Sequence, residues 1–154
     1  MKKSFPLLAL FLAILAAFTL SACTQKPSPS TTPSVGGGSV EPIPMGEILS
    51  VTDTQIVISV NEVEEGTTLI TVMAELKANS ALSYEIANGM ITSLNGKTTA
   101  ANEFWGLYTS DTALSNTEWG TAEYEGKTYG SAMFGAETMP VISNGIYIWK
   151  LSSF

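Results

Sequence analysis

The sequence has no histidine and no arginine, and it contains one cysteine among 154 residues. Without an imidazole, a serine or cysteine nucleophile has no histidine to accept its proton, and a zinc site of the Cys/His type lacks its ligands. Acidic residues outnumber lysines by 14 to 7, which opposes the basic surface that a nucleic-acid partner requires. The composition therefore favours a binding or structural protein over an enzyme.

The chain begins with a pattern typical of an export signal. Lys2 and Lys3 precede an apolar run over residues 5–18 that only Pro6 interrupts. The run is short for a membrane span and polar residues follow it closely, so we interpret it as a secretory signal.

The single cysteine lies where such a signal would be cleaved. Leu20-Ser21-Ala22-Cys23 resembles the lipobox of bacterial lipoproteins. The resemblance implies cleavage after residue 22, a diacylglycerol on the Cys23 thiol, and anchoring to the outer face of the bacterial cell membrane. The alternative is an ordinary signal peptide that leaves Cys23 as a free thiol. Cleavage would remove two lysines and no acids, so the net charge would change from −7 to −9 over 132 residues. Anionic lipid repels such a chain, so attachment would depend on acyl chains.

Composition divides the rest of the chain into two parts. Residues 23–44, which follow the signal at 1–22, are rich in Pro, Ser, Thr and Gly and predict an extended tether that begins at the lipidated cysteine. Residues 45–154 have the size of one domain with one core.

Hydrophobic periodicity predicts one helix in that domain. Residues 54–60 alternate as a strand, and the turn at 64–66 leads to Thr67 or Thr68 as a helix cap. Leu69, Val72, Met73 and Leu76 then form one apolar stripe that ends near Asn79.

After the helix, the pattern returns to a period of two. Strands are expected at residues 82–86, 90–94, 104–108 and 146–151, with tight turns at Asn95-Gly96 and Asn144-Gly145. The polar, glycine-rich residues 109–144 predict less regular structure. One helix on a mixed sheet indicates an α+β domain of the β-grasp kind, with a pure β-sandwich as the alternative.

Several segments together resemble a known family, the bacterial lipoprotein domain of unknown function that is related to the C-terminal domain of transcobalamin and intrinsic factor. They are the start of the helix at residues 66–69, the hairpin at 91–96, and the strand Phe104-Trp105-Gly106-Leu107-Tyr108. The C-terminal part of the domain also resembles the family, at Gly135, Pro140-Val141 and residues 144–149. The resemblance implies a β-grasp-like sheet that holds one helix, cobalamin or a related corrinoid as ligand, and a vitamin importer as partner. The vertebrate relatives enclose cobalamin with an additional helical barrel, for which we expect no counterpart here.

Aromatic residues concentrate between positions 104 and 134. A planar ligand could stack on Trp105, Trp119 and Tyr124 and accept or donate hydrogen bonds at the hydroxyls of Tyr108 and Tyr129. Trp105 and Tyr108 are on opposite pleats of one strand. The alternative is that these aromatics fill the core, which we expect for Phe104, Leu107, Tyr147 and Trp149.

The carboxylates near that segment offer weaker alternatives. Asp111, Glu118, Glu123 and Glu125 could hold Ca²⁺ or act on a glycosidic bond, but their spacing fits no known motif. The sequence thus predicts a non-enzymatic, lipid-anchored protein that binds a small ligand. The alternative is a surface interaction or adhesion module that docks a protein or a glycan.

Overall fold

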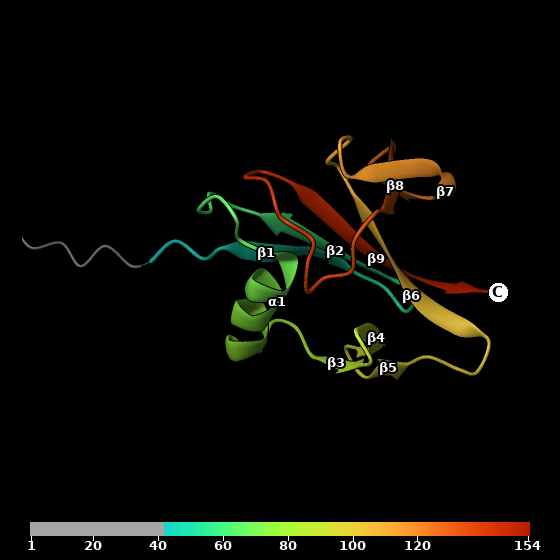
Figure 1. Cartoon of the computed structure of the whole chain (residues 1–154). Helices are drawn as coiled ribbons and strands as arrows, with labels where there is room; N and C mark the ends of the chain where they lie inside the picture. The colour runs from blue at the N-terminus through green and yellow to red at the C-terminus, as the bar shows by residue number, and fades with distance from the viewer. Residues whose placement is uncertain (1–41) are drawn as a thin grey trace, which may run out of the picture. The chain divides into compact units, whose positions relative to one another are not determined.

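The computed structural model describes residues 42–154, which form one domain (Figure 1). The signal, Cys23 and all but the last residues of the tether lie outside the described residues. The elements are β1 (Gly46–Val51), β2 (Gln55–Val60), α1 (Leu69–Ala78), β3 (Tyr84–Ala87), β4 (Met90–Leu94), β5 (Lys97–Thr98), β6 (Glu103–Thr109), β7 (Ser115–Tyr124), β8 (Lys127–Ala132) and β9 (Ile146–Ser153). No helix in this part of the chain is long and apolar enough to cross a membrane.

The strands form two sheets. The larger has the order β1-β2-β9-β6-β8-β7, and β3, β4 and β5 form a small second sheet. The predicted α+β class with one helix is therefore confirmed for the described residues. Every pairing among their named strands is antiparallel, whereas the sequence had suggested a mixed sheet.

The central strands bury both of their faces, because alternate side chains point to opposite sides of a sheet. On the first face, Ile58 of β2, Leu107 of β6 and Tyr147 of β9 join the core under α1 and the small sheet. On the second face, Val57 and Ile148 pack in a smaller cluster with residues of β6, β7 and β8. The core prediction holds for Leu107, Tyr147 and Trp149, which are all buried, but it is wrong for Phe104, which is half-buried and stacks on Phe154 with their ring centres 5.0 Å apart.

The helix follows its predicted stripe. Its buried residues are Leu69, Val72, Met73 and Leu76, and Thr68 and Asn79 are its cap residues. The Thr68 hydroxyl makes no capping bond and instead lies 3.1 Å from the Thr71 hydroxyl. The helix therefore depends mainly on burial of its apolar stripe against the sheet.

The small sheet contains the predicted tight turn. Asn95 and Gly96 have φ of 45° and 79°, and the Ser83 N–H donates a 2.9 Å hydrogen bond to Asn95 Oδ1. Asn88 and Gly89, between β3 and β4, also have positive φ (53° and 76°). Both sites use the left-handed conformation that asparagine and glycine tolerate.

Residues 109–144 are more regular than their composition suggested. They contain the β7–β8 hairpin, which turns at Glu125 and Gly126 with φ of 48° and 72°. The hairpin lies against the second face of the central strands, where Gln55 Nε2 donates a 3.1 Å hydrogen bond to the Glu123 carbonyl. The polar composition of residues 109–144 concealed the hairpin, because few apolar residues of β7 and β8 are needed to cover the second face of the central strands.

Candidate ligand-binding groove

The five predicted binding aromatics do not form one site. Trp105 is buried in the core on the first face, whereas Tyr108 and Tyr129 are buried on the second face with the half-buried Tyr124. Trp105 and Tyr108 thus occupy opposite pleats, as predicted. Trp119 is 63% exposed in the irregular part of β7, between Asn116 and Thr121.

The tyrosines of the second face serve the packing of the hairpin. Burial raises the pKa of both Tyr124 and Tyr129 above the ordinary value of 10.0, and the nearby Glu125 carboxylate raises it further. The Lys150 ammonium lies 5.9 Å from the centre of the Tyr108 ring. None of these three tyrosines lines either of the two cavities described below, so those cavities offer no support for stacking of a planar ligand on this cluster.

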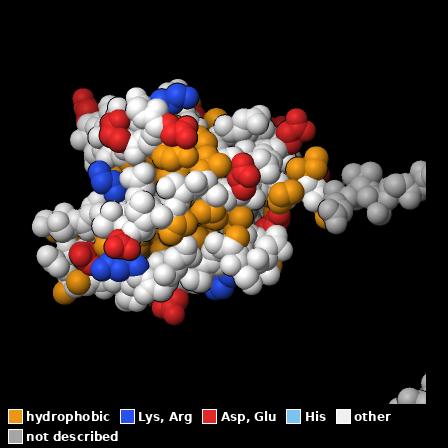
Figure 2. Space-filling view, turned by 180° about the vertical axis from the view of Figure 1, so that it is seen from behind, with side chains coloured by type: hydrophobic (Ala, Val, Ile, Leu, Met, Phe, Trp, Pro, Cys, Tyr) orange, Lys and Arg blue, Asp and Glu red, His pale blue; other side chains and the backbone are white. Residues whose placement is uncertain are grey.

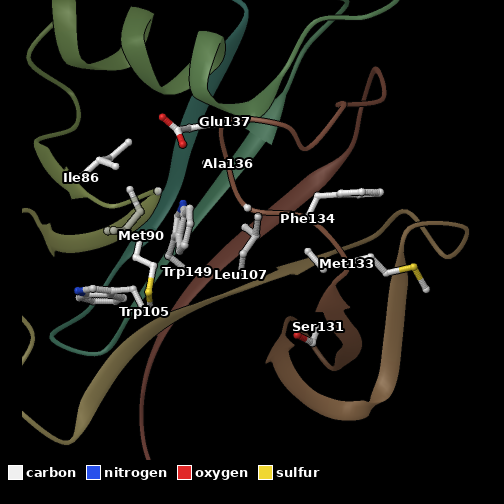
Figure 3. A pocket seen from close by; sticks show the side chains of 14 residues that line it. Ile86, Met90, Trp105, Leu107, Ser131, Met133, Phe134, Ala136, Glu137 and Trp149 are labelled. Carbon is white, nitrogen blue, oxygen red and sulfur yellow. The ribbon is translucent and has the colours of Figure 1, made fainter.

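The first face carries a cavity of about 240 Å³, which we name the Trp149 groove (Figure 3). It lies between residues 86–91 around the β3–β4 turn, β6, residues 131–137 at and after the end of β8, and β9. Trp105, Leu107 and Trp149 line it from the central strands. It therefore joins four segments that are distant in the sequence.

Large apolar side chains remain exposed around this groove. Met90, Met133 and Phe134 line it and are 57%, 44% and 46% exposed. Figure 2 shows that hydrophobic side chains gather on one face of the surface, with acidic and lysine side chains at their margins. Exposed apolar side chains around a cavity are typical of a binding site.

Few polar side chains line the groove. Trp149 is 3% exposed, and its indole Nε1 is buried without a hydrogen-bond partner among the described residues. The indole of Trp105, by contrast, donates a 3.3 Å hydrogen bond to the Lys97 carbonyl. Among the described residues that line the groove, Glu137 is the only charged one and Ser131 supplies the only hydroxyl.

A second cavity of about 290 Å³ lies on the other side of Trp105. Thr52, Asp53, Asn95 and Lys97 line it together with four apolar or aromatic residues, including Trp105 itself. Its polar lining suits water better than an apolar ligand. The Trp149 groove is therefore the better candidate site.

The sequence interpretation included only Trp105 among the groove residues. Trp149 had been assigned to the core, and it is indeed buried, but it also lines the groove. Met90, Met133, Phe134 and Glu137 come from turns and strand ends, where no periodicity distinguishes exposed from buried apolar residues. Across residues 42–154, no group of three or more Cys, Asp or Glu side chains could hold a metal ion.

Comparison of the chain with protein-family models, curated proteins and solved structures finds no match. The resemblance to the transcobalamin-like domain therefore stays an expectation.

Proposed function

We propose that the protein binds a small, largely apolar ligand in the Trp149 groove and does not catalyse a reaction. The observation that supports this most is the exposure of Met90, Met133 and Phe134 around a cavity with an aromatic floor. Exposed side chains of this size lower the solubility of a free domain, and a ligand that covers them gains their burial.

The size of the groove limits the ligand. Cavities that take drug-sized molecules are ~300–1,000 Å³, so about 240 Å³ suits a compact ligand with one ring system. Cobalamin, the ligand implied by the family resemblance, is larger and could enter only by one edge. We include it as a test ligand rather than as the favoured one.

Calorimetric titration of the full-length chain in detergent with 4-ethylphenol tests the proposal, with empty micelles as the blank. A ligand of this size in an apolar pocket should bind with a Kd of about 1 mM. Phe134→Ala should weaken binding by about fivefold because it removes apolar contact area at the groove. Trp119→Ala is the matched control, since it truncates an exposed aromatic that does not line the groove.

Equal effects of the two variants, or no saturable binding up to ~10 mM, would contradict the proposal. Cobalamin is titrated in parallel by quenching of tryptophan fluorescence, corrected for its absorbance. Saturable quenching below ~100 μM would restore the corrinoid as the favoured ligand.

The exposed Trp119 supports a second candidate, docking of a protein or a glycan at the cell surface. Tryptophan is enriched at binding hot spots, and this side chain is 63% exposed. In that case Trp119→Ala should abolish capture of a cell-surface partner, while Phe134→Ala should leave it unchanged.

We further propose that lipid at Cys23 holds the domain on the outer face of the membrane. The lipobox-like residues 20–23 and the composition of the tether support this. A vitamin importer as partner is a proposal that rests on the corrinoid alternative alone.

A further inference from the structure

We propose that the ligand of the Trp149 groove is an aromatic amine with an acceptor oxygen, which receives the Trp149 indole N–H while the ammonium faces Glu137. This inference rests on the proposed function and deepens it, because it names the chemical class of the ligand. It is carried by two polar groups on residues that line this groove, the buried indole nitrogen of Trp149 and the carboxylate of Glu137.

The first group is the unpaired indole nitrogen. Trp149 is fixed in the middle of the sheet, paired with Ile56 of β2 and with Leu107 of β6. Its N–H can only donate, and a buried donor without a partner destabilises a protein. Because no described residue accepts from it, an acceptor on a ligand in the groove would satisfy it. The observation therefore selects ligands that carry a hydroxyl, carbonyl or ether oxygen at their inner end.

Met90 is the most exposed apolar side chain that lines the groove among the described residues. It lines the same groove as Trp149, whose ring nitrogen lies at the end nearer Glu137 in Figure 3. An unbranched thioether changes rotamer readily, and Met90 is 57% exposed. It can therefore move aside when a ligand enters.

The second group is the Glu137 carboxylate. It lies close to the β3–β4 turn, since a Cβ atom placed on Gly89 would be 3.4 Å from Glu137 Oε2. Within residues 42–154 no lysine lines the groove, so the formal charge that these residues bring to it is negative. A cationic group on the ligand would gain from this charge, and the gain should fall with salt because Glu137 is exposed.

Four probes of nearly equal shape separate the two contributions: tyramine, phenethylamine, 4-ethylphenol and ethylbenzene. They are titrated into the full-length chain in detergent, with empty micelles as the blank, at low and high salt. We expect tyramine to bind about 5–10 times more tightly than phenethylamine, because one hydrogen bond to a buried donor changes the affinity by about this factor. We expect it to bind about 2–3 times more tightly than 4-ethylphenol at low salt and equally at high salt.

Two variants assign these preferences to residues. Trp149→Phe keeps an aromatic ring and removes the N–H, so the preference for the hydroxylated probes should disappear. Glu137→Gln should remove the preference for the amines and leave the hydroxyl preference intact. If Trp149→Phe does not fold, the indole proton resonance of Trp149 in the unaltered chain gives the same answer, because it should shift downfield with 4-ethylphenol but not with ethylbenzene.

The outcomes distinguish a failure of the assigned ligand class from a failure of the proposed binding function. If all four probes bind with equal affinity, the groove binds ligands but the assignment of Trp149 and Glu137 is wrong. If none of them binds, both the inference and the proposed function are wrong.

Discussion

The Lys150 ammonium of the central strand β9 donates a 3.0 Å hydrogen bond to the carbonyl of Thr121 in the edge strand β7. The two residues are not neighbours in the sheet order, in which β6 and β8 lie between their strands. The bond therefore crosses the second face and holds the β7–β8 hairpin against it. The Gln55 side chain adds a second such bond, to the Glu123 carbonyl.

Lys150→Met should loosen this hairpin. Methionine keeps the apolar stem of the side chain but cannot donate to the Thr121 carbonyl, so we expect a loss of about 1 kcal/mol in stability. Amide hydrogen exchange should accelerate in β7 and β8 more than in β2 and β9. Lys127→Met, at the exposed end of the hairpin, is the control and should change neither quantity; equal protection in both variants would show that the bond has no stabilising role.

The turn before β9 should not tolerate a methyl group at Gly145. A Cβ atom there would lie 2.8 Å from the Ile142 carbonyl oxygen and 2.9 Å from both Ile142 Cγ1 and Tyr147 Cε2. Gly145→Ala should therefore destabilise the protein by about 1–3 kcal/mol, measured by urea unfolding. At Gly135 the nearest atom would be 3.7 Å away, so Gly135→Ala should be tolerated. Two equally stable variants would contradict this packing.

The buried Tyr147 hydroxyl should make stability depend on alkaline pH. Burial raises the pKa of Tyr147 above its ordinary value of 10.0, although the hydrogen bond from the Ile142 N–H, 2.9 Å long, acts in the opposite direction. The folded state then holds this proton more tightly than the unfolded chain. Its contribution is fully present below pH 10 and is lost as the pH rises from there through the folded pKa.

Tyr147→Phe should therefore lower stability at pH 7 by about 1 kcal/mol, because the Ile142 N–H loses its acceptor. The difference between the two proteins should shrink above pH 10, since phenylalanine has no proton to lose. Urea unfolding at several pH values measures this difference. A difference that stays constant up to pH 11 would exclude Tyr147 as the titrating group.

Cys23→Ser should release the protein from the membrane into the medium, because a serine hydroxyl does not take the place of the thiol in lipidation. Fractionation of expressing cells, followed by detection of the protein in each fraction, measures the release. Retention of the variant in the membrane fraction would show that something other than Cys23 lipid anchors the chain.

The sequence predicted the elements in which apolar residues recur with a clear period. The α1 stripe and the alternating Ile56, Ile58 and Val60 of β2 pack in the core as expected, and Val57 on the other face of β2 is buried as well. The strand β1 was not predicted, because its burial alternates but its residue types do not: the exposed Leu49 and Val51 are apolar, and the half-buried Ser50 is polar. The β7–β8 hairpin escaped notice because Glu125 is an unusual residue for a left-handed turn position.

The candidate site was less predictable than the fold. Strand alternation predicted that Trp105 and Tyr108 lie on opposite faces, and the structure places them so, which means that the candidate aromatics do not form one surface. The groove forms where the β3–β4 turn meets residues 133–137, a contact that no local pattern reveals. The missing hydrogen-bond partner of the Trp149 indole results from tertiary packing, which the sequence pattern does not reveal. In the sequence, Trp149 has the pattern of an ordinary core residue of a strand.

The most direct test of ligand binding in the Trp149 groove is mapping of backbone amide chemical shifts during a titration with 4-ethylphenol. The groove predicts that the largest changes fall at Met90, Met133, Phe134 and their neighbours, with little change around Trp119. Changes centred on Trp119 and β7, or no change up to ~10 mM probe, would contradict the claim that this groove is the binding site.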